Sequence, residues 1–369
     1  RSVSRGLGDV YKRQYLLTAS LKKTGEEKTA CILVATSGDT GKAALEGFRD
    51  VDRTKILVFY PKDGVSDIQK LQMVTQEGEN TGVCAVIGNF DDAQTGVKRI
   101  FSDPVLRERL AADGKLLSSA NSINWGRVLP QIVYYISAYC DLLASGAIRM
   151  GEKIDFCVPT GNFGNILAAY YAKRMGLPVG KLICASNSND VLTEFIRTGV
   201  YDRNRPFHAT MSPSMDILIS SNLERLLYLL SGSDEAVRGY MRQLSETGRY
   251  AVTPELHAKI LESFACGCCD EASTAETIGR VFKERSYLID THTAVAWNVL
   301  EQFRRESGSR SMSVVVSTAS AFKFCASVLT ALGVEKQAEG TQILRQLSET
   351  TGWPVPKPLA ALDGKKIRF

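Results

Sequence analysis

The chain has 369 residues, of which 44% are hydrophobic and 23% are charged, so it is large enough for one big α/β body or for two domains. Its net charge of +5 comes from basic residues scattered among nearly as many acidic ones, which excludes an extended basic surface for nucleic acid. No apolar run reaches membrane-spanning length, no signal-peptide layout is present, and the nine cysteines lack disulfide-framework or zinc-site spacing. We therefore expect a cytoplasmic protein with reduced thiols, no metal site, and no membrane or nucleic-acid partner.

The first residues differ in pattern from the rest of the chain. Residues 1–14, RSVSRGLGDVYKRQ, have no clear apolar period, whereas a helical pattern runs from Tyr15 to Leu21. We interpret residues 1–14 as a scar of sequence assembly that replaces native sequence. The alternative is a genuine disordered terminus.

Short apolar runs then alternate with helical patterns along most of the chain. The runs lack a two-residue alternation, which is typical of strands buried on both faces of a parallel sheet. This pattern predicts a doubly wound α/β architecture. The predicted strands are 32–35, 56–60, 83–87, 156–159, 182–185 and 314–318, and the predicted helices are 40–49, 66–77, 90–102, 125–144, 165–175 and 292–305.

A polar stretch at 118–121 interrupts these elements and marks a candidate domain boundary. We expect a smaller α/β domain over 15–118 and a larger one over 119–369. Within the larger domain, the segment 233–277 has a mostly helical pattern and reads as a helical insertion.

The stretch ATSGDTGKA, residues 35–43, follows an apolar run and precedes a helical pattern. A glycine loop in that place suits an anion at a helix N-terminus. A nucleotide-binding Walker loop is excluded, because Thr36 stands where the first glycine is needed and Ala43 replaces the hydroxyl that binds Mg²⁺.

A second glycine loop, VPTGNFGN, connects the predicted strand 156–159 to the helix that follows. Gly161 and Gly164 allow close backbone approach to a ligand, and N–H groups at the helix start would hold a phosphate. A tight turn with a purely structural role is the alternative. The spacing is not G-x-G-x-x-G, so a dinucleotide is not expected.

Other signals leave their alternatives open. Ser317–Ser320 follows a buried strand and suits either a ligand crevice or a helix N-cap. Arg127, at the end of SANSINWGR, would be either an anion clamp in the first turn of a helix or a surface residue. The three histidines are isolated, and G-x-S-x-G is absent, so neither a metal site nor a serine hydrolase is indicated.

Taken together, ATSGDTG, SANSINWGR, VPTGNFGN, SNSND (186–190) and TMSPSMDI (210–217) resemble threonine synthase, from about Tyr15 nearly to the C-terminus. The resemblance implies a fold-type II enzyme dependent on pyridoxal 5'-phosphate, with two doubly wound α/β domains and mainly parallel sheets. It also implies that the cofactor phosphate binds Gly161, Asn162, Phe163, Gly164 and Asn165, and that Thr318 faces the pyridine nitrogen.

The same resemblance implies the substrate site and the reaction. Ser37, Gly38, Asp39 and Thr40 match the loop that receives the amino-acid end of the substrate, and Asn124 and Arg127 are expected on its phosphate side. The implied reaction converts O-phospho-L-homoserine and water to L-threonine and phosphate, by elimination followed by water addition.

One family feature is not found. The family carries its Schiff-base lysine in a Phe-Lys-Asp motif that would fall near Gly6, but residues 1–14 contain no such motif and Lys12 is out of register. We therefore predict no catalytic lysine and no turnover for the chain as printed. The alternatives are another fold-type II lyase, such as a serine or threonine dehydratase, or a catalytically dead homologue that binds a ligand.

Overall fold

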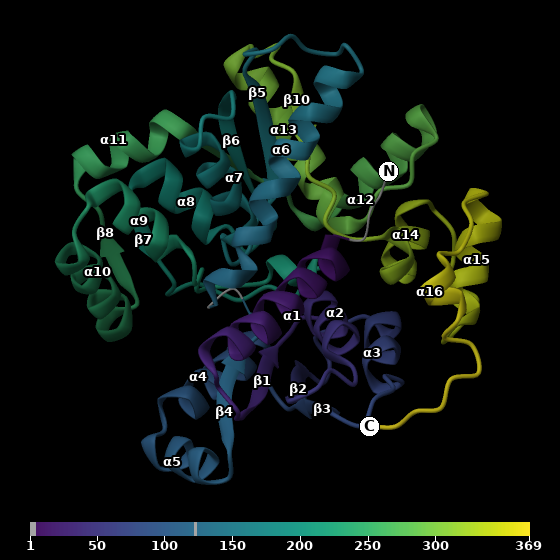
Figure 1. Cartoon of the computed structure of the whole chain (residues 1–369). Coiled ribbons are helices and arrows are strands. Elements are labelled where there is room, and N and C mark those ends of the chain that lie inside the picture. The colour runs from purple at the N-terminus through teal and green to yellow at the C-terminus, as the bar shows by residue number, and fades with distance from the viewer. Residues whose placement is uncertain (1–4, 122–123) are drawn as a thin grey trace. The chain divides into compact units, whose positions relative to one another are not determined.

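The computed structural model describes the backbone of residues 5–121 and 124–369, with side chains from Gln14 onward (Figure 1). The chain forms two compact units. One contains the residues up to Pro130 together with 319–330 and 334–369, and the other contains 131–318 and 331–333. Among the described helices, none combines the length and the apolar character needed to cross a membrane.

The first unit is built on a four-stranded parallel sheet with the order β3-β2-β1-β4. The chain moves outward from β1 to β2 and β3, then returns to place β4 on the other side of β1. The direction of winding therefore reverses between β1 and β4. The strands are β1 Thr29–Ala35, β2 Thr54–Pro61, β3 Thr81–Val86 and β4 Lys115–Ser119.

Helix α2 packs its small and apolar side chains against the centre of this sheet, where Ala44, Leu45 and Phe48 meet Ile32 and Val34 in one buried cluster. The helices before the second unit are α1 Arg5–Thr24, α2 Asp39–Phe48, α3 Asp67–Val74, α4 Phe90–Ser102, α5 Pro104–Ala112 and the 3₁₀ turn η1 Trp125–Arg127. The C-terminal helices are η3 Ala321–Lys323, α14 Cys325–Ala331, α15 Gln342–Thr351 and α16 Lys357–Ala360.

Helix α1 begins at Arg5 rather than at Tyr15, where the apolar period starts. The added residues contain no proline, so nothing in the chain stops the helix there. A helical backbone over residues 5–14 disagrees with the alternative of a disordered terminus.

The second unit is built in the same way, on a parallel sheet of order β10-β5-β6-β9. Winding reverses between β5 and β10. Its strands are β5 Ile154–Pro159, β6 Val179–Ser186, β9 Phe264–Cys268 and β10 Ser313–Val315, and a separate antiparallel pair joins β7 Val200–Asp202 to β8 Arg249–Ala251.

Helices cover both faces of this sheet. The Cys157 thiol contacts the Ala296 carbonyl of α13 at 3.1 Å, whereas the neighbouring Phe156 packs edge-on against Tyr135 of α6 with ring centroids 5.0 Å apart. Since adjacent strand residues point to opposite faces, α13 and α6 lie on opposite sides of β5. The predicted doubly wound α/β fold with parallel sheets is confirmed.

The helices of the second unit are α6 Leu129–Ala144, α7 Gly164–Arg174, α8 Val191–Thr198, η2 Pro213–Met215, α9 Leu223–Ser231, α10 Asp234–Thr247, α11 Pro254–Ser263, α12 Glu271–Arg285 and α13 Thr291–Ser307.

The units divide the chain differently from the sequence-based expectation of 15–118 and 119–369. The polar stretch at 118–121 contains the end of β4 and the two residues after it and is not a linker, because β4 pairs with β1 at the edge of the sheet of the first unit. The C-terminal segments return to the first unit, where the backbone N–H of Arg368 donates to the Val74 carbonyl at 2.8 Å. Such pairings over a long stretch of chain leave no periodic signal in the sequence.

The expected helical insertion at 233–277 is also wrong in part. It contains α10 and α11, but 264–268 forms β9, which pairs with β6 in the main sheet. The residues of β9, FACGC, are mostly small and include a glycine, so they lack the β-branched composition that marks a strand.

Candidate functional site

The carboxyl edge of the second sheet gathers the residues that were expected to bind the cofactor. Residues 160–165 follow β5, and Ser317 and Thr318 follow β10, on the two sides of the point where winding reverses. The backbone N–H of Val316 donates to the Cys157 carbonyl at 2.9 Å and fixes the two strand ends side by side. Open α/β sheets bind ligands at this position. The structure therefore brings the loop at 161–165 and Thr318 together.

The loop at 161–165 is shaped to expose backbone donors. Phe163 has a left-handed φ of 61° and ends the loop, so that α7 starts at Gly164. A Cβ on Gly161 would lie 2.7 Å from the Ser214 carbonyl oxygen, so only glycine fits. Within the described residues, the backbone N–H groups of 161–165 have no protein acceptor. Such a row of N–H groups at a helix start suits an anion.

The two asparagines of this loop present their amide N–H groups. The Asn165 Oδ1 accepts from the Tyr135 hydroxyl at 2.7 Å, and the Asn162 Oδ1 accepts from the Ser221 hydroxyl at 3.2 Å. Because hydroxyl donors hold both amide oxygens, the orientation of each amide leaves nitrogen donors for a ligand. Thr318 is exposed at the neighbouring strand end.

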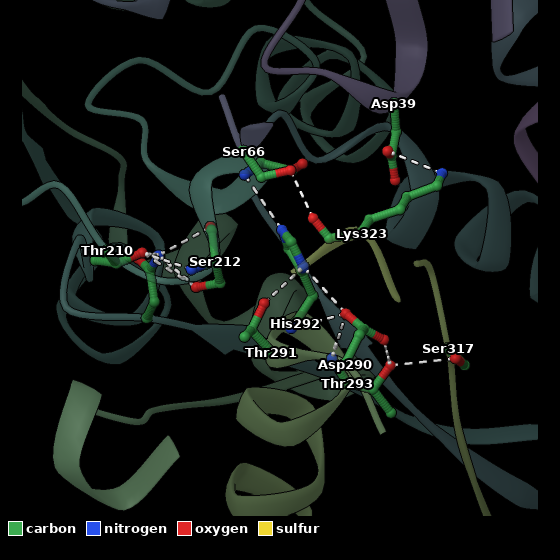
Figure 2. A network of polar contacts seen from close by, with 12 residues as sticks. Asp39, Ser66, Thr210, Ser212, Asp290, Thr291, His292, Thr293, Ser317 and Lys323 are labelled. Carbon is green, nitrogen blue, oxygen red and sulfur yellow. Dashed lines mark hydrogen bonds and ion pairs between the residues drawn. The ribbon is translucent and has the colours of Figure 1, made fainter. Parts of the chain in front are cut away.

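A buried network lies at the start of α13, in the same unit (Figure 2). The Asp290 carboxylate accepts from the backbone N–H of His292 at 2.9 Å and caps the helix. It also lies 3.1 Å from the His292 Nδ1 and is bound by the Thr293 hydroxyl, which is itself 3.2 Å from Ser317. Burial alone would raise the pKa of Asp290, but the hydrogen bonds from His292 and Thr293 outweigh it and hold the pKa below its usual value.

The motifs SNSND and TMSPSMDI contact each other through the buried carboxylate of Asp216. Asp216 of TMSPSMDI accepts from the Asn187 amide at 2.7 Å and from the Thr210 hydroxyl at 2.7 Å. Burial raises the pKa of Asp216, although these hydrogen bonds oppose the shift. SNSND and TMSPSMDI, which are separated in the chain by residues 191–209, thus form one polar cluster that includes η2.

The first unit has an equivalent edge, where β1 and β4 end on either side of the winding reversal. Asn121, after β4, holds this edge because its side chain accepts from the Ala35 N–H at 2.9 Å and donates to the Ala35 carbonyl at 2.6 Å. Ser37, Gly38, Asp39 and Thr40 follow β1. Both candidate sites therefore occupy the same topological position in their own sheets.

The loop after β1 is tightly specified. Thr36 is buried, and its hydroxyl accepts from the N–H groups of Gly38 at 2.9 Å and Gly41 at 2.8 Å. Gly38 has φ of 127°, which strongly favours glycine. The Asp39 carboxylate is bound by the Lys323 ammonium at 2.9 Å and by the Gln69 amide at 2.8 Å.

Asn124 and Arg127 follow β4 and lie at the same edge. The Asn124 side chain caps η1 through the Gly126 N–H, at 3.0 Å. Arg127 belongs to this 3₁₀ turn and not to α6, which corrects the helix predicted for 125–144. Its guanidinium donates to the Thr40 hydroxyl at 3.2 Å and to the Ala120 carbonyl at 3.4 Å. The structure thus places Arg127 beside the predicted substrate loop.

Several residues at these edges were missed from the sequence. Lys323 and Gln69 contact the loop from distant positions in the chain, and a single sequence holds no signal of such contacts. Asn121 lies within SANSINWGR, but its contact with Ala35 could not be predicted from the sequence. Asp290 had a local signal, because an aspartate directly before a helical pattern is a common N-cap. The position expected for the Schiff-base lysine, near Gly6, lies outside the described side chains, as do Ser122 and Ile123.

No protein-family model matches the chain. The chain is 45% identical over 313 residues to threonine synthase-like 1 of Macaca fascicularis, which covers 83% of this chain and 42% of that protein. It is 37% identical over 323 residues to the threonine synthase of Saccharomyces cerevisiae, covering 84% of this chain and 61% of the relative. The crystal structure of threonine synthase from Brucella melitensis, described as bound to pyridoxal 5'-phosphate, matches with a TM-score of 0.81 and 38% identity, over 98% of this chain and 71% of that one.

The chain belongs to the threonine synthase family. This confirms the resemblance seen in the five motifs, and it confirms the fold. The threonine synthase-like 1 relative is more than twice as long as the part matched, since the chain spans 42% of its length.

Proposed function

We propose that this member of the threonine synthase family binds pyridoxal 5'-phosphate and O-phospho-L-homoserine, for the conversion of that substrate and water to L-threonine and phosphate. The observation that supports the proposal best is the repeated placement of family motifs. Each sheet carries one motif set at its own winding reversal, which is where sheets of this kind bind ligands.

The second unit fits the cofactor. The backbone N–H groups of 161–165 and the amides of Asn162 and Asn165 form a donor set without a positive side chain, which suits the cofactor phosphate. The exposed Thr318 hydroxyl would bind the pyridine nitrogen and, being neutral, would not hold that nitrogen protonated. When bound, the cofactor supplies an electron sink that eases proton removal from an amino-acid substrate.

The first unit fits a phosphorylated amino acid. Ser37–Thr40 would receive the substrate carboxylate, and Arg127, with Asn124, would bind the phosphate. Arg127 is held by Thr40 and Ala120, so its planar guanidinium is oriented before substrate arrives. Proton transfer in this family is expected from the Schiff-base lysine. The proposed function of residues 1–369 as printed is therefore to bind the cofactor and the substrate, whereas turnover requires that lysine.

Titration of the purified chain tests the proposal. Absorbance and calorimetry should show one site for pyridoxal 5'-phosphate and, in its presence, one for O-phospho-L-homoserine. Arg127→Ala should weaken O-phospho-L-homoserine about 10- to 100-fold, as expected for a lost charged contact, and leave cofactor affinity unchanged. Arg109→Ala, on an exposed face of α5, is the matched control.

Two results would contradict the proposal. If L-serine bound as tightly as O-phospho-L-homoserine, the dehydratase-like alternative would be favoured. If Arg127→Ala and Arg109→Ala behaved alike, Arg127 would have no role in phosphate binding.

A further inference from the structure

Asp290, His292 and Thr293 are buried side chains that the proposed function does not use. Each is at most 3% exposed, and all belong to the N-cap or the first turn of α13. Figure 2 shows His292 and Thr293 on either side of the Asp290 carboxylate, with Thr293 reaching Ser317. The three residues therefore connect parts of the unit that are far apart in sequence.

His292 connects Asp290 to the loop at 161–165. The His292 Nε2 accepts a hydrogen bond from the backbone N–H of Ser214 at 3.2 Å. The carbonyl of Ser214 in turn lies against Gly161, 2.7 Å from where a Cβ would stand. His292 thus holds the residue whose carbonyl lies against the first glycine of the loop.

This contact determines which nitrogen of His292 carries the proton. A nitrogen that accepts from an N–H group must be unprotonated, so the proton is on Nδ1. The Nδ1 lies 3.1 Å from the Asp290 Oδ1 and donates to it. The carboxylate therefore stabilises this tautomer and, together with the Thr291 hydroxyl 3.3 Å from the Nδ1, orients the ring of His292.

Thr293 connects the same carboxylate to the end of β10. Its hydroxyl donates to the Asp290 Oδ2. The same hydroxyl lies 3.2 Å from the Ser317 Oγ and is directed toward it, so its single hydrogen is shared between the carboxylate and Ser317. This contact links Asp290, through Thr293, to the residue directly before Thr318.

We propose that Asp290 is a positioning residue that aligns the two cofactor-binding segments of the second unit, the loop at 161–165 through His292 and the Ser317–Thr318 strand end through Thr293. The cofactor part of this inference rests on the proposed function. The coupling, by which we mean the hydrogen-bonded connection of Asp290 to these two segments, is a property of the protein alone, so it is tested without any ligand.

Hydrogen–deuterium exchange of the full chain, followed by mass spectrometry, measures the coupling. Thr293→Val is nearly isosteric and should accelerate exchange about 3- to 10-fold in peptides covering 313–320, as expected for one lost hydrogen bond. Thr293→Ser should restore the wild-type rate. His292→Phe should accelerate exchange in 211–217 and 158–167 but not in 313–320, and Asp290→Asn should accelerate all three.

His257→Phe is the control for general loosening of the unit, because the His257 ring also makes a hydrogen bond, a partly buried one with the Ile196 carbonyl at 2.8 Å, but contacts neither segment. It should leave all three peptides unchanged. The inference is overturned if Asp290→Asn affects only the start of α13, or if Thr293→Val leaves 313–320 unchanged.

Bound pyridoxal 5'-phosphate reports separately on the two segments, through its absorbance maximum for Ser317–Thr318 and through its phosphorus NMR shift for the loop at 161–165. With pyridoxal 5'-phosphate bound, Thr293→Val should shift the absorbance maximum and keep the phosphorus NMR shift, whereas His292→Phe should do the reverse. A wild-type chain that binds no cofactor would refute the proposed function, and the exchange rates would still decide the coupling. Identical spectral changes in Thr293→Val and His292→Phe would contradict the inference that Thr293 acts on the Ser317–Thr318 segment and His292 on the loop at 161–165.

Discussion

Asp39 places a carboxylate in the loop that the proposed function assigns to a negatively charged substrate. An uncompensated charge there would repel the ligand. Lys323 and Gln69 both bind the Asp39 Oδ1, and the Lys323 and Asp39 side chains are only 19% and 25% exposed. We interpret the Lys323 ammonium as neutralising the Asp39 carboxylate in this loop.

Removing the ammonium should therefore weaken anion binding. We expect Lys323→Met to lower the affinity for O-phospho-L-homoserine roughly tenfold, about 1.4 kcal/mol, because Asp39 then faces the substrate unpaired. Adding Asp39→Asn to this variant should recover most of the affinity, which calorimetric titration of the double-mutant cycle would measure. Lys336→Met, which removes an exposed pair with Glu339, should have no effect. Additive effects in the cycle would show that the two residues act separately.

Gly38 is the residue whose replacement should damage this loop most. Its φ of 127° disfavours a side chain, and a Cβ would stand 2.4 Å from the Gln69 Cδ. We expect Gly38→Ala to lower the free energy of unfolding by roughly 1–3 kcal/mol, measured by urea denaturation. Gly96→Ala, at an exposed position of α4 with open space around it, should be neutral or slightly stabilising. Equal costs at both positions would contradict the strain argument.

At the scale of elements, the sequence predicts the strands and loops that have a local pattern and misses those that depend on tertiary contacts. The apolar runs that became β1, β5 and β6 were found because burial on both faces leaves a continuous apolar stretch, whereas β2 was found from its apolar residues although one of its faces is partly exposed. β9 was missed because its small residues acquire strand structure only between neighbours, and β4 because its end is polar. The glycine loops were likewise found from local pattern, whereas Lys323, Gln69 and Asn121 reach the site through tertiary contacts.

The N-cap of α13 gives the structure a specific pH dependence. The pKa of Asp290 lies below its usual value of about 3.9, so the folded chain binds this proton more weakly than the unfolded chain. The ionised Asp290 carboxylate stabilises the fold fully above the pKa that it has in the unfolded chain. This stabilisation is lost as the pH falls through the pKa that it has in the folded chain. We expect Asp290→Asn to cost about 1–3 kcal/mol at pH 7 and to flatten the acid limb of stability.

Urea denaturation between pH 3 and pH 7 measures this effect as the difference between wild type and variant. The difference should shrink toward the acid end. Asp234→Asn, at an exposed helix start, should give a small difference that varies little with pH. A constant offset for Asp290→Asn would mean that its carboxylate does not titrate with a lowered pKa in the folded state.

At the scale of the whole molecule, the two units share one sheet topology but differ in how the chain completes them. Apart from residues 331–333, the second unit is one continuous stretch, 131–318, which holds its whole sheet. The first unit is discontinuous, because residues 319–330 and 334–369 return to it. Ser66 illustrates the dependence, since its hydroxyl donates to the Lys323 carbonyl at 2.5 Å across this gap in sequence.

This difference predicts that only one unit folds as a simple fragment. Residues 131–318 should melt cooperatively and retain slow exchange in β5 and β6, because their sheet and both helical layers are included. The fragment 15–118 should be far less stable, because it lacks the contacts of Lys323 to Asp39 and of Arg368 to Val74. Thermal melts by circular dichroism would compare the two fragments with the full chain. A cooperative transition for 15–118, with none for 131–318, would show that the continuous stretch does not determine which unit folds alone.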